Sequence, residues 1–255
     1  MFKEPWRSII VAVLTALLTI LGGVGVTQVS GCGAVIPPPI IDPDKPPDTG
    51  KVDPWNAIGK IAMQGSYCSG TVIGPRRDDG RYSIVSAAHC FRQVGQEATF
   101  IQREGTARKI TVVAIDRRAD VAICRTETGQ GDMAYTQVSL GSLPVGQKIW
   151  HGGYGRHIPG NKEEGTVASG PNQDNQVKYR LSVSPGDSGG GIITDDTGAL
   201  LSPVCCTTRL DGPGEVWGGS PEQIRRMLAT PTDFIDLPPA EMPPPPKEMP
   251  AVAPK

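Results

Sequence analysis

The sequence predicts an all-β fold built as antiparallel barrels or a sandwich. Short runs rich in β-branched and apolar residues follow one another at close spacing, and no helical period appears between them. Most of the 32 glycines lie in the middle of the chain, whereas the 25 prolines concentrate in the two flanks. Without the flanks, roughly 170 residues remain, which is enough to bury a sizeable core.

Turn signals at 77–80 and 195–198 divide the apolar runs into short strands. A single helix is expected near the end of this region, where Ser220 can cap it and Pro221 takes the first helical position; it should stop before Pro231. The expected strands are 57–63, 69–73, 82–87, 98–102, 109–115, 121–124, 148–152, 176–181, 190–194, 199–204 and 215–217.

Residues 1–32 are predicted to be a targeting segment. Lys3 and Arg7 precede an uncharged stretch that ends in Val29-Ser30-Gly31-Cys32. Small residues before a cysteine resemble the lipobox of bacterial lipoproteins, which implies cleavage before Cys32 and acylation of that residue. An uncleaved membrane anchor and an ordinary secretory signal remain alternatives, since the uncharged run is long enough to span a bilayer. All three place the rest of the chain outside the cytoplasm.

The proline-rich flanks are expected to lie outside the folded domain. Residues 33–54 are predicted to be an extended linker, with a ligand for a proline-binding module as the alternative. The domain is expected at 55–229, and residues 230–255 are predicted to be a disordered proline-rich tail.

Composition excludes some classes of function. With 25 basic and 26 acidic residues, the net charge of -1 gives no reason to expect nucleic acid as a partner. Two of the three histidines, His151 and His157, do not have the spacing of metal ligands relative to the cysteines, so no metal site is predicted. No organic cofactor is implied.

The chemistry centres on Ser188, which lies in the glycine-rich run 186–190. A serine needs a base and an acid that orients this base. The base is predicted to be His89, in Ala-Ala-His-Cys after a strand, and the acid Asp120, followed by Val-Ala-Ile. Asp116 is the competing carboxylate, but it lacks that apolar flank.

These motifs, in the order His, Asp, Ser, resemble the chymotrypsin-like (trypsin-like) serine proteases. The resemblance implies two six-stranded antiparallel β-barrels with a short C-terminal helix, and a serine endopeptidase acting on protein or peptide substrates. It makes His89 the general base and Asp120 its orienting acid, with the backbone N–H groups of Gly186 and Ser188 as the oxyanion hole. Asp187 is expected to fix this turn by pairing with a cation.

The resemblance also implies a disulfide between Cys68 and Cys90, which would staple the histidine loop. With Cys32 assigned to lipid, an odd number of cysteines remains, and a bridge from Cys124 to Cys205 or Cys206 is one possibility.

By the same resemblance, Ser182 forms the base of the specificity pocket, with Cys205 and Thr207 in its walls. Because Ser182 provides no carboxylate, small or medium uncharged side chains are the expected substrates. Two alternatives stay open: a catalytically weak homologue that serves as a membrane-tethered binding or scaffold protein, and an esterase without peptidase activity.

Overall fold

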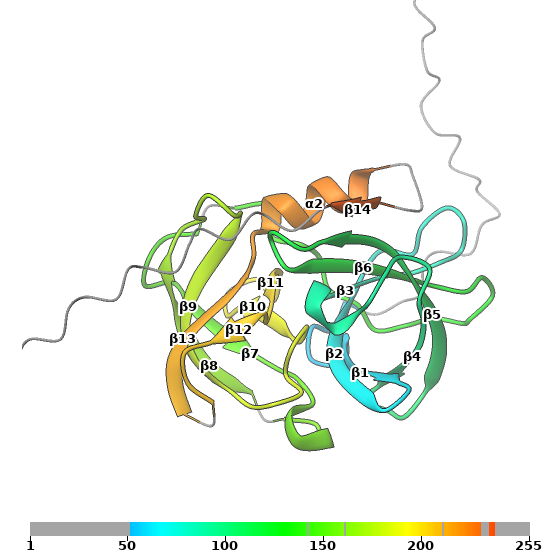
Figure 1. Cartoon of the computed structure of the whole chain (residues 1–255), viewed down its shortest axis with the longest axis horizontal. Helices are drawn as coiled ribbons and strands as arrows, with labels where there is room; N and C mark the ends of the chain where they lie inside the picture. Colours follow the sequence, from blue (N-terminus) through cyan, green and yellow to red (C-terminus); the bar gives the residue numbers. More distant parts are fainter. Residues whose placement is uncertain (1–51, 142, 161, 211, 231–234, 238–255) are drawn as a thin grey trace, which may run out of the picture. The chain divides into compact units, whose positions relative to one another are not determined.

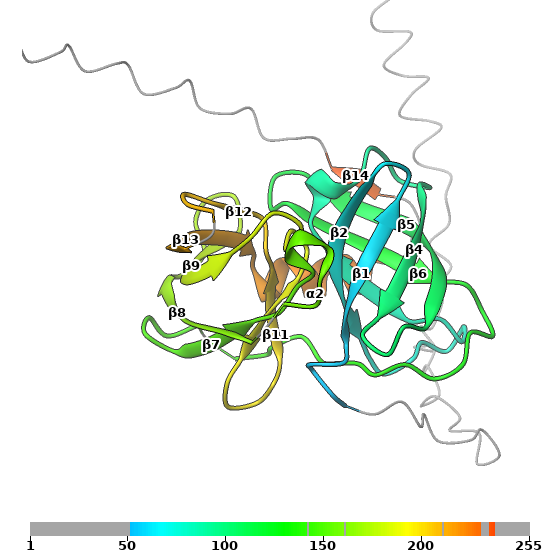
Figure 2. The same cartoon turned by 90° about the horizontal axis from the view of Figure 1, so that it is seen from below.

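The computed structural model describes residues 52–141, 143–160, 162–210, 212–230 and 235–237, all within the compact unit Pro47–Lys255. Two β bodies lie side by side in this unit, as two perpendicular views show (Figures 1 and 2). The all-β prediction is therefore confirmed, with the first sheet closed as a barrel and the second forming a half-barrel.

The first body is a closed antiparallel barrel, because β5 and β6 pair with each other at the two ends of the ladder β5-β4-β1-β2-β3-β6. Its apolar core includes Ile61, Tyr82 and Phe100. The barrel strands are β1 (Ile58–Met63), β2 (Ser66–Ile73), β3 (Ser83–Ser86), β4 (Glu97–Gln102), β5 (Ala107–Asp116) and β6 (Val121–Thr126).

The second body is an antiparallel sheet of order β11-β10-β7-β8-β9-β13-β12, so β11 and β12 are its two edges. In β9 every second side chain is buried, from Val177 to Val183, which is the alternation of a strand with one apolar face. The strands are β7 (Lys148–His151), β8 (Glu163–Ser169), β9 (Gln176–Val183), β10 (Gly191–Thr194), β11 (Leu200–Pro203), β12 (Cys206–Thr207) and β13 (Gly212–Gly219).

Two strands of the second sheet were not predicted. In β8 only Val167 is buried, so no alternating pattern marks the strand in the sequence. β12 has only two residues, too few to show a period.

An apolar cluster separate from the barrel core joins the two bodies to the helix α2 (Pro221–Ala229). It contains Ile58 and Ile123 from the barrel, Trp150 and Ile193 from the sheet, and Ile224 from α2. The helix has the predicted limits, and Ser220 accepts a hydrogen bond from the N–H of Gln223.

The C-terminal flank differs from its prediction at three residues. Ile235–Leu237 form β14, which pairs in parallel with residues 114–116 of β5. The outer edge of β5 is open there, because β4 pairs only as far as Thr111. A short segment in the tail can therefore add to the sheet.

The targeting segment 1–32, Cys32 included, and the linker, apart from its last three residues, lie outside the described residues. Within the described part of the chain, no helix is long and apolar enough to cross a bilayer.

Candidate active site

Ser188 lies on the loop between β9 and β10 and is half-buried. The loop depends on glycine at two positions with left-handed backbone, Gly186 (φ 100°) and Gly189 (φ 82°). An added Cβ at Gly186 would collide with the ring of Tyr67, and one at Gly189 with the carbonyl oxygen of Ser69. The sequence therefore fixes a tight turn around the serine.

The backbone N–H groups in this turn fall into two classes. Those of Asp187, Gly189 and Gly190 donate to carbonyl oxygens, at 2.7–3.0 Å. Within the described residues, those of Gly186 and Ser188 donate to no acceptor. Asp187 lies between these two residues in the chain. An oxyanion hole requires two unpaired N–H groups of this kind, close to the serine that would attack.

Ser69 ties this turn to the barrel and was not foreseen from the sequence. Its N–H donates to the carbonyl oxygen of Ser188 at 2.7 Å, and its hydroxyl donates to that of Gly186 at 2.8 Å. The same hydroxyl accepts from the N–H of Tyr154 at 2.9 Å, and Ser69 is fully buried. The partners of Ser69 are remote in the chain, so the sequence marks the residue only by its position beside Cys68.

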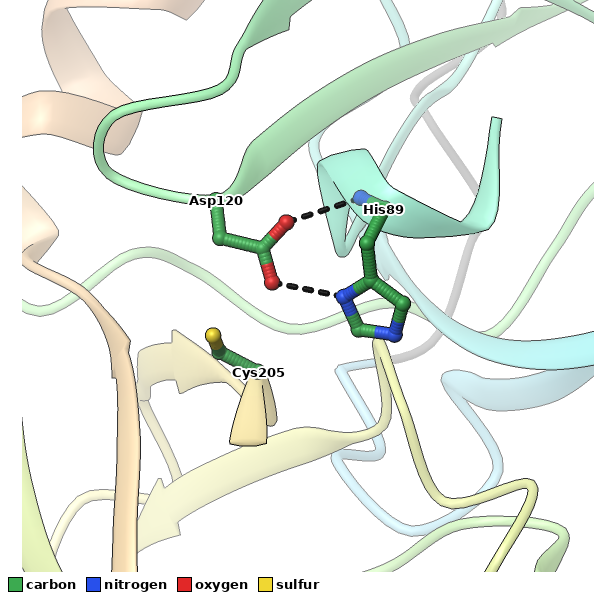
Figure 3. A group of neighbouring side chains, drawn as sticks. All are labelled: His89, Asp120 and Cys205. Atoms are coloured by element: carbon green, nitrogen blue, oxygen red, sulfur yellow. Dashed lines mark hydrogen bonds and ion pairs between the residues drawn. The ribbon is translucent and has the colours of Figure 1, made fainter. Parts of the chain in front are cut away.

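His89 and Asp120 come together at the mouth of the barrel. His89 lies in the 3-10 turn Ala88–Cys90 after β3, and Asp120 immediately precedes β6. One carboxylate oxygen of Asp120 accepts from the backbone N–H of His89 at 2.8 Å, and the other is 2.7 Å from Nδ1 (Figure 3). This two-point contact fixes the ring and turns Nε2 away from the carboxylate.

Each member of this pair shifts the pKa of the other. The hydrogen bond to Asp120 raises the pKa of His89, against the opposing effect of burial. Burial of Asp120 opposes its ionisation, but the hydrogen bonds and charge of His89 outweigh this and lower the pKa of the carboxyl. The pair therefore favours an ionised aspartate beside an imidazole that is more basic than usual.

The competing acid, Asp116, has a different task. It accepts from the N–H groups of Arg118 and Ala119 in the turn after β5, and from the side chain of Gln223 on α2. It therefore closes a turn and anchors the helix, and Asp120 is the carboxylate that contacts the histidine.

Ser188 comes from the second body, and its backbone lies close to the histidine turn of the barrel. Its carbonyl oxygen lies 3.9 Å from Sγ of Cys90, the residue after His89. Among the described residues, no hydrogen bond joins the hydroxyl of Ser188 to His89. Catalytic hydrogen bonds of this kind are often long without substrate and tighten when it binds.

Asp187 has the structural role expected from the sequence. Its carboxylate accepts from the N–H groups of Gly155 and Ser184, each at 2.8 Å, and lies 3.6 Å from Nε2 of the buried His151. Burial opposes ionisation, but His151 and these N–H groups lower the pKa of Asp187. His151 therefore lies where a cationic partner was expected, and the sequence did not identify it.

The three residues predicted for the specificity pocket do not line one common cavity. Ser182 pairs with Pro213 across β9 and β13, and it lines two cavities of about 450 and 440 Å³. Neither cavity is lined by Cys205 or Thr207. The hydroxyl of Thr207 is turned to the backbone of Arg209.

The cysteine predictions have two outcomes. Cys68 and Cys90 form the expected disulfide. A bridge from Cys124 to Cys205 or Cys206 is wrong. Cys124 is free and fully buried in the barrel core, whereas Cys206 begins β12 in the second body and Cys205 directly precedes it.

Cys205 completes the group drawn in Figure 3, with its sulfur facing the carboxylate of Asp120. One ligand atom each from His89, Asp120 and Cys205 lies within 4.8 Å of the others. The group offers nitrogen, oxygen and sulfur donors, and Nδ1 of His89 is already engaged with one carboxylate oxygen of Asp120.

The model of the trypsin-like peptidase domain family matches residues 68–201, more than half of the chain. The chain belongs to this family. It is therefore a hydrolase of the serine-protease type. A search of curated protein sequences found no significant match.

Two solved structures share the fold. One is Rv3671c from M. tuberculosis H37Rv, a serine-to-alanine mutant in an inactive form, with TM-score 0.53 and 20% identity over 69% of this chain and 86% of that one. The other is a serine endoprotease from Yersinia pestis, with TM-score 0.57 and 14% identity over 68% of this chain. The present chain covers 62% of the length of the Y. pestis protein.

Proposed function

We propose that this protein is a serine endopeptidase that hydrolyses peptide bonds through an acyl-enzyme on Ser188. The observation that carries the proposal is the two-point contact between Asp120 and His89, which leaves Nε2 free to act as a base. The two unpaired N–H groups in the turn around Ser188 support it independently.

In the proposed mechanism, Oγ of Ser188 attacks the substrate carbonyl carbon while Nε2 of His89 takes its proton. The N–H groups of Gly186 and Ser188 stabilise the oxyanion, and the protonated imidazole is stabilised by Asp120. His89 then gives the proton to the leaving amine. Water repeats the sequence on the acyl-enzyme, which releases the acid and restores the hydroxyl.

The strand β12 offers a place for the substrate backbone. It is the last strand of the second sheet, so one edge of it is open for a peptide to add as a further strand. The absence of a carboxylate at Ser182 supports small or medium uncharged side chains at the cleavage site.

We place the activity outside the cytoplasm, with the domain tethered to a membrane by a lipid on Cys32 or by an uncleaved anchor, or else secreted. The disulfide between Cys68 and Cys90 supports this location, because such bonds persist in oxidising compartments. Mass spectrometry of the mature N-terminus distinguishes the three, since only the lipoprotein carries a diacylglyceryl group on Cys32.

Labelling with a serine-directed fluorophosphonate tests the proposal. We expect the wild type to be labelled on Ser188 and Ser188→Ala to be unlabelled. A wild type that reacts no faster than Ser188→Ala would remove the enzyme function. Digestion of a peptide library then separates a peptidase from an esterase and reports the preferred side chain.

One observation favours a second candidate, a catalytically weak homologue that serves as a tethered binding or scaffold protein. The predicted pocket residues do not line a common cavity, because the two cavities at Ser182 are lined by neither Cys205 nor Thr207. In that case labelling of the wild type stays at the level of Ser188→Ala although the chain is folded.

A further inference from the structure

Two adjacent cysteines, Cys205 and Cys206, lie beside the Asp120–His89 pair. Their sulfur atoms are 2.9 Å apart. Cys205 is half-buried and Cys206 is exposed, so reagents can reach the pair from solvent. Cys124, the remaining free cysteine of the described residues, is fully buried.

We propose that Cys205 and Cys206 form a reversible vicinal disulfide, and that this bond lowers the activity of Ser188. The sulfur atoms need to approach by less than 1 Å to reach the roughly 2.05 Å of a disulfide. Consecutive Cα atoms are about 3.8 Å apart, below the usual span of about 4.4–6.8 Å across a disulfide. The ring is therefore strained and easily reduced, as a reversible switch requires.

The two thiols differ in a way that sets the order of events. The hydrogen bond from Cys205 lowers the pKa of Cys206, against the opposing effect of burial. That hydrogen bond, burial and the negative charge of Asp120 raise the pKa of Cys205. Cys206 is thus the thiolate that attacks first.

The oxidant in the proposed step is a small-molecule disulfide. The Cys206 thiolate attacks one of its sulfur atoms and releases the first small thiol. Cys205 then loses its proton and attacks the Cys206 sulfur, which releases the second. The protein loses two electrons and two protons, and the two small thiols carry them away.

Ring closure acts on catalysis through Asp120. The sulfur of Cys205 faces this carboxylate, and its thiol is among the groups that stabilise the charged form (Figure 3). The single S–H of Cys205 can donate either to Cys206 or to Asp120. The disulfide removes this hydrogen and draws the sulfur of Cys205 towards Cys206, so Asp120 loses the thiol as a donor. Because hydrogen bonds to charged groups are strong and a thiol is a weak donor, we expect a roughly tenfold loss of activity.

The experiment exposes the full-length chain to oxidised or reduced glutathione and then to the fluorophosphonate. Trypsin releases Ser188 and both cysteines on one peptide, 181–209, so the label and the redox state are read together. We expect oxidation to remove the mass of two hydrogen atoms from this peptide and to slow labelling about tenfold. Reduced glutathione should reverse both changes.

Cys206→Ser is the matched control. Its labelling rate after oxidised glutathione is compared with its own rate after reduced glutathione, and not with the rate of the wild type. Its oxidised and reduced forms should label at the same rate, whereas those of the wild type should differ. Non-reducing peptide mapping verifies that Cys68–Cys90 stays closed throughout.

The activity readout rests on the proposed function, and a failure of that function can be told apart from a failure of the disulfide proposal. If reduced wild type does not label, the proposed function fails, and the mass readout still tests the disulfide. An unchanged peptide mass, a glutathione adduct that does not close, or a closed ring with unchanged labelling would each overturn the inference.

Discussion

The backbone at Asp120 has a φ of 55°, a conformation that costs free energy for any residue except glycine. Aspartate is among the residues that tolerate it best. The conformation presents both carboxylate oxygens to His89, which receives them at its backbone N–H and at Nδ1. The site therefore holds local strain that the surrounding hydrogen bonds offset.

Replacing Asp120 by asparagine tests this pairing. An amide offers only one accepting oxygen, so it cannot accept from both groups of His89, and the ring adopts the wrong tautomer. We expect the rate of fluorophosphonate labelling to fall by about four orders of magnitude. Labelling within about tenfold of the wild type would show that Asp120 does not orient the base.

The pH dependence of the labelling rate follows from the raised pKa of His89. Only the neutral imidazole accepts a proton, so the rate rises with pH, with a midpoint above the ordinary value of 6.5. In Asp120→Asn the carboxylate that raises this pKa is gone, and the midpoint moves to lower pH. Stopped-time labelling between pH 5 and 9 gives both midpoints, and equal midpoints would contradict the assigned cause.

Ser69 acts on the same chemistry through the backbone. In Ser69→Ala the carbonyl oxygen of Gly186 loses a donor and the N–H of Tyr154 loses an acceptor. The orphaned N–H of the buried Tyr154 costs about 1–3 kcal/mol in the free energy of unfolding, and the turn that presents Gly186 loosens. We expect lower stability in urea denaturation and slower labelling.

The matched control is Ser66→Ala, because Ser66 is exposed on the same strand. It should leave both the stability and the labelling rate near the wild-type values. If Ser69→Ala behaves like this control, the serine has no positioning role.

At the scale of the element, the histidine turn is held by a guanidinium from the loop after β5. Arg117 donates from one nitrogen to the carbonyl oxygens of Ala88 and Phe91, each at 3.2 Å, and from another to that of Arg92 at 2.7 Å. These three oxygens belong to residues on both sides of His89 in the sequence. Arg117 thus holds in place the turn that carries His89, the proposed base.

We expect Arg117→Ala to slow labelling at least tenfold and to lower the free energy of unfolding by at least about 1.5 kcal/mol. Arg117→Lys should recover only part of both, since an ammonium cannot reproduce the fork. The neighbouring Arg118 is exposed and pairs with Asp174, so Arg118→Ala is the control. Equal labelling by the two alanine variants would contradict this role of Arg117.

The sequence pattern predicted elements where burial alternates or a cap is present, as in β9 and α2. It missed β8, where one side chain is buried, and β14, which pairs along the part of β5 that β4 leaves open. The same limit applies to the site. Ser188, His89 and Asp120 stand in motifs, whereas Ser69, Arg117 and His151 are single polar residues whose partners are remote in the chain.

At the scale of the whole molecule, the site is assembled from both bodies. His89 and Asp120 belong to the barrel, and Ser188 to the second sheet. The apolar cluster around Ile58, Trp150 and Ile224 holds the bodies together, and Ser69 joins them by hydrogen bonds next to the serine. The proposed activity therefore requires the folded state of the entire domain.

The disulfide between Cys68 and Cys90 contributes to that state by closing a loop with a sequence separation of 22 residues. Loop-closure entropy predicts about 3 kcal/mol of stabilisation for a loop of this length. For a domain of this size, this corresponds to a fall in Tm of roughly 6–12 °C when both cysteines are replaced by alanine. Calorimetry of Cys68→Ala/Cys90→Ala measures the change.

Wild type in strong reductant is the control for this double variant. The two should share one Tm, because both lack the same cross-link. A double variant that melts within about 2 °C of the oxidised wild type would mean that the unfolded chain is already compact around this loop. The cross-link would then serve to position His89 beside Ser188, and the loss would appear in the labelling rate instead.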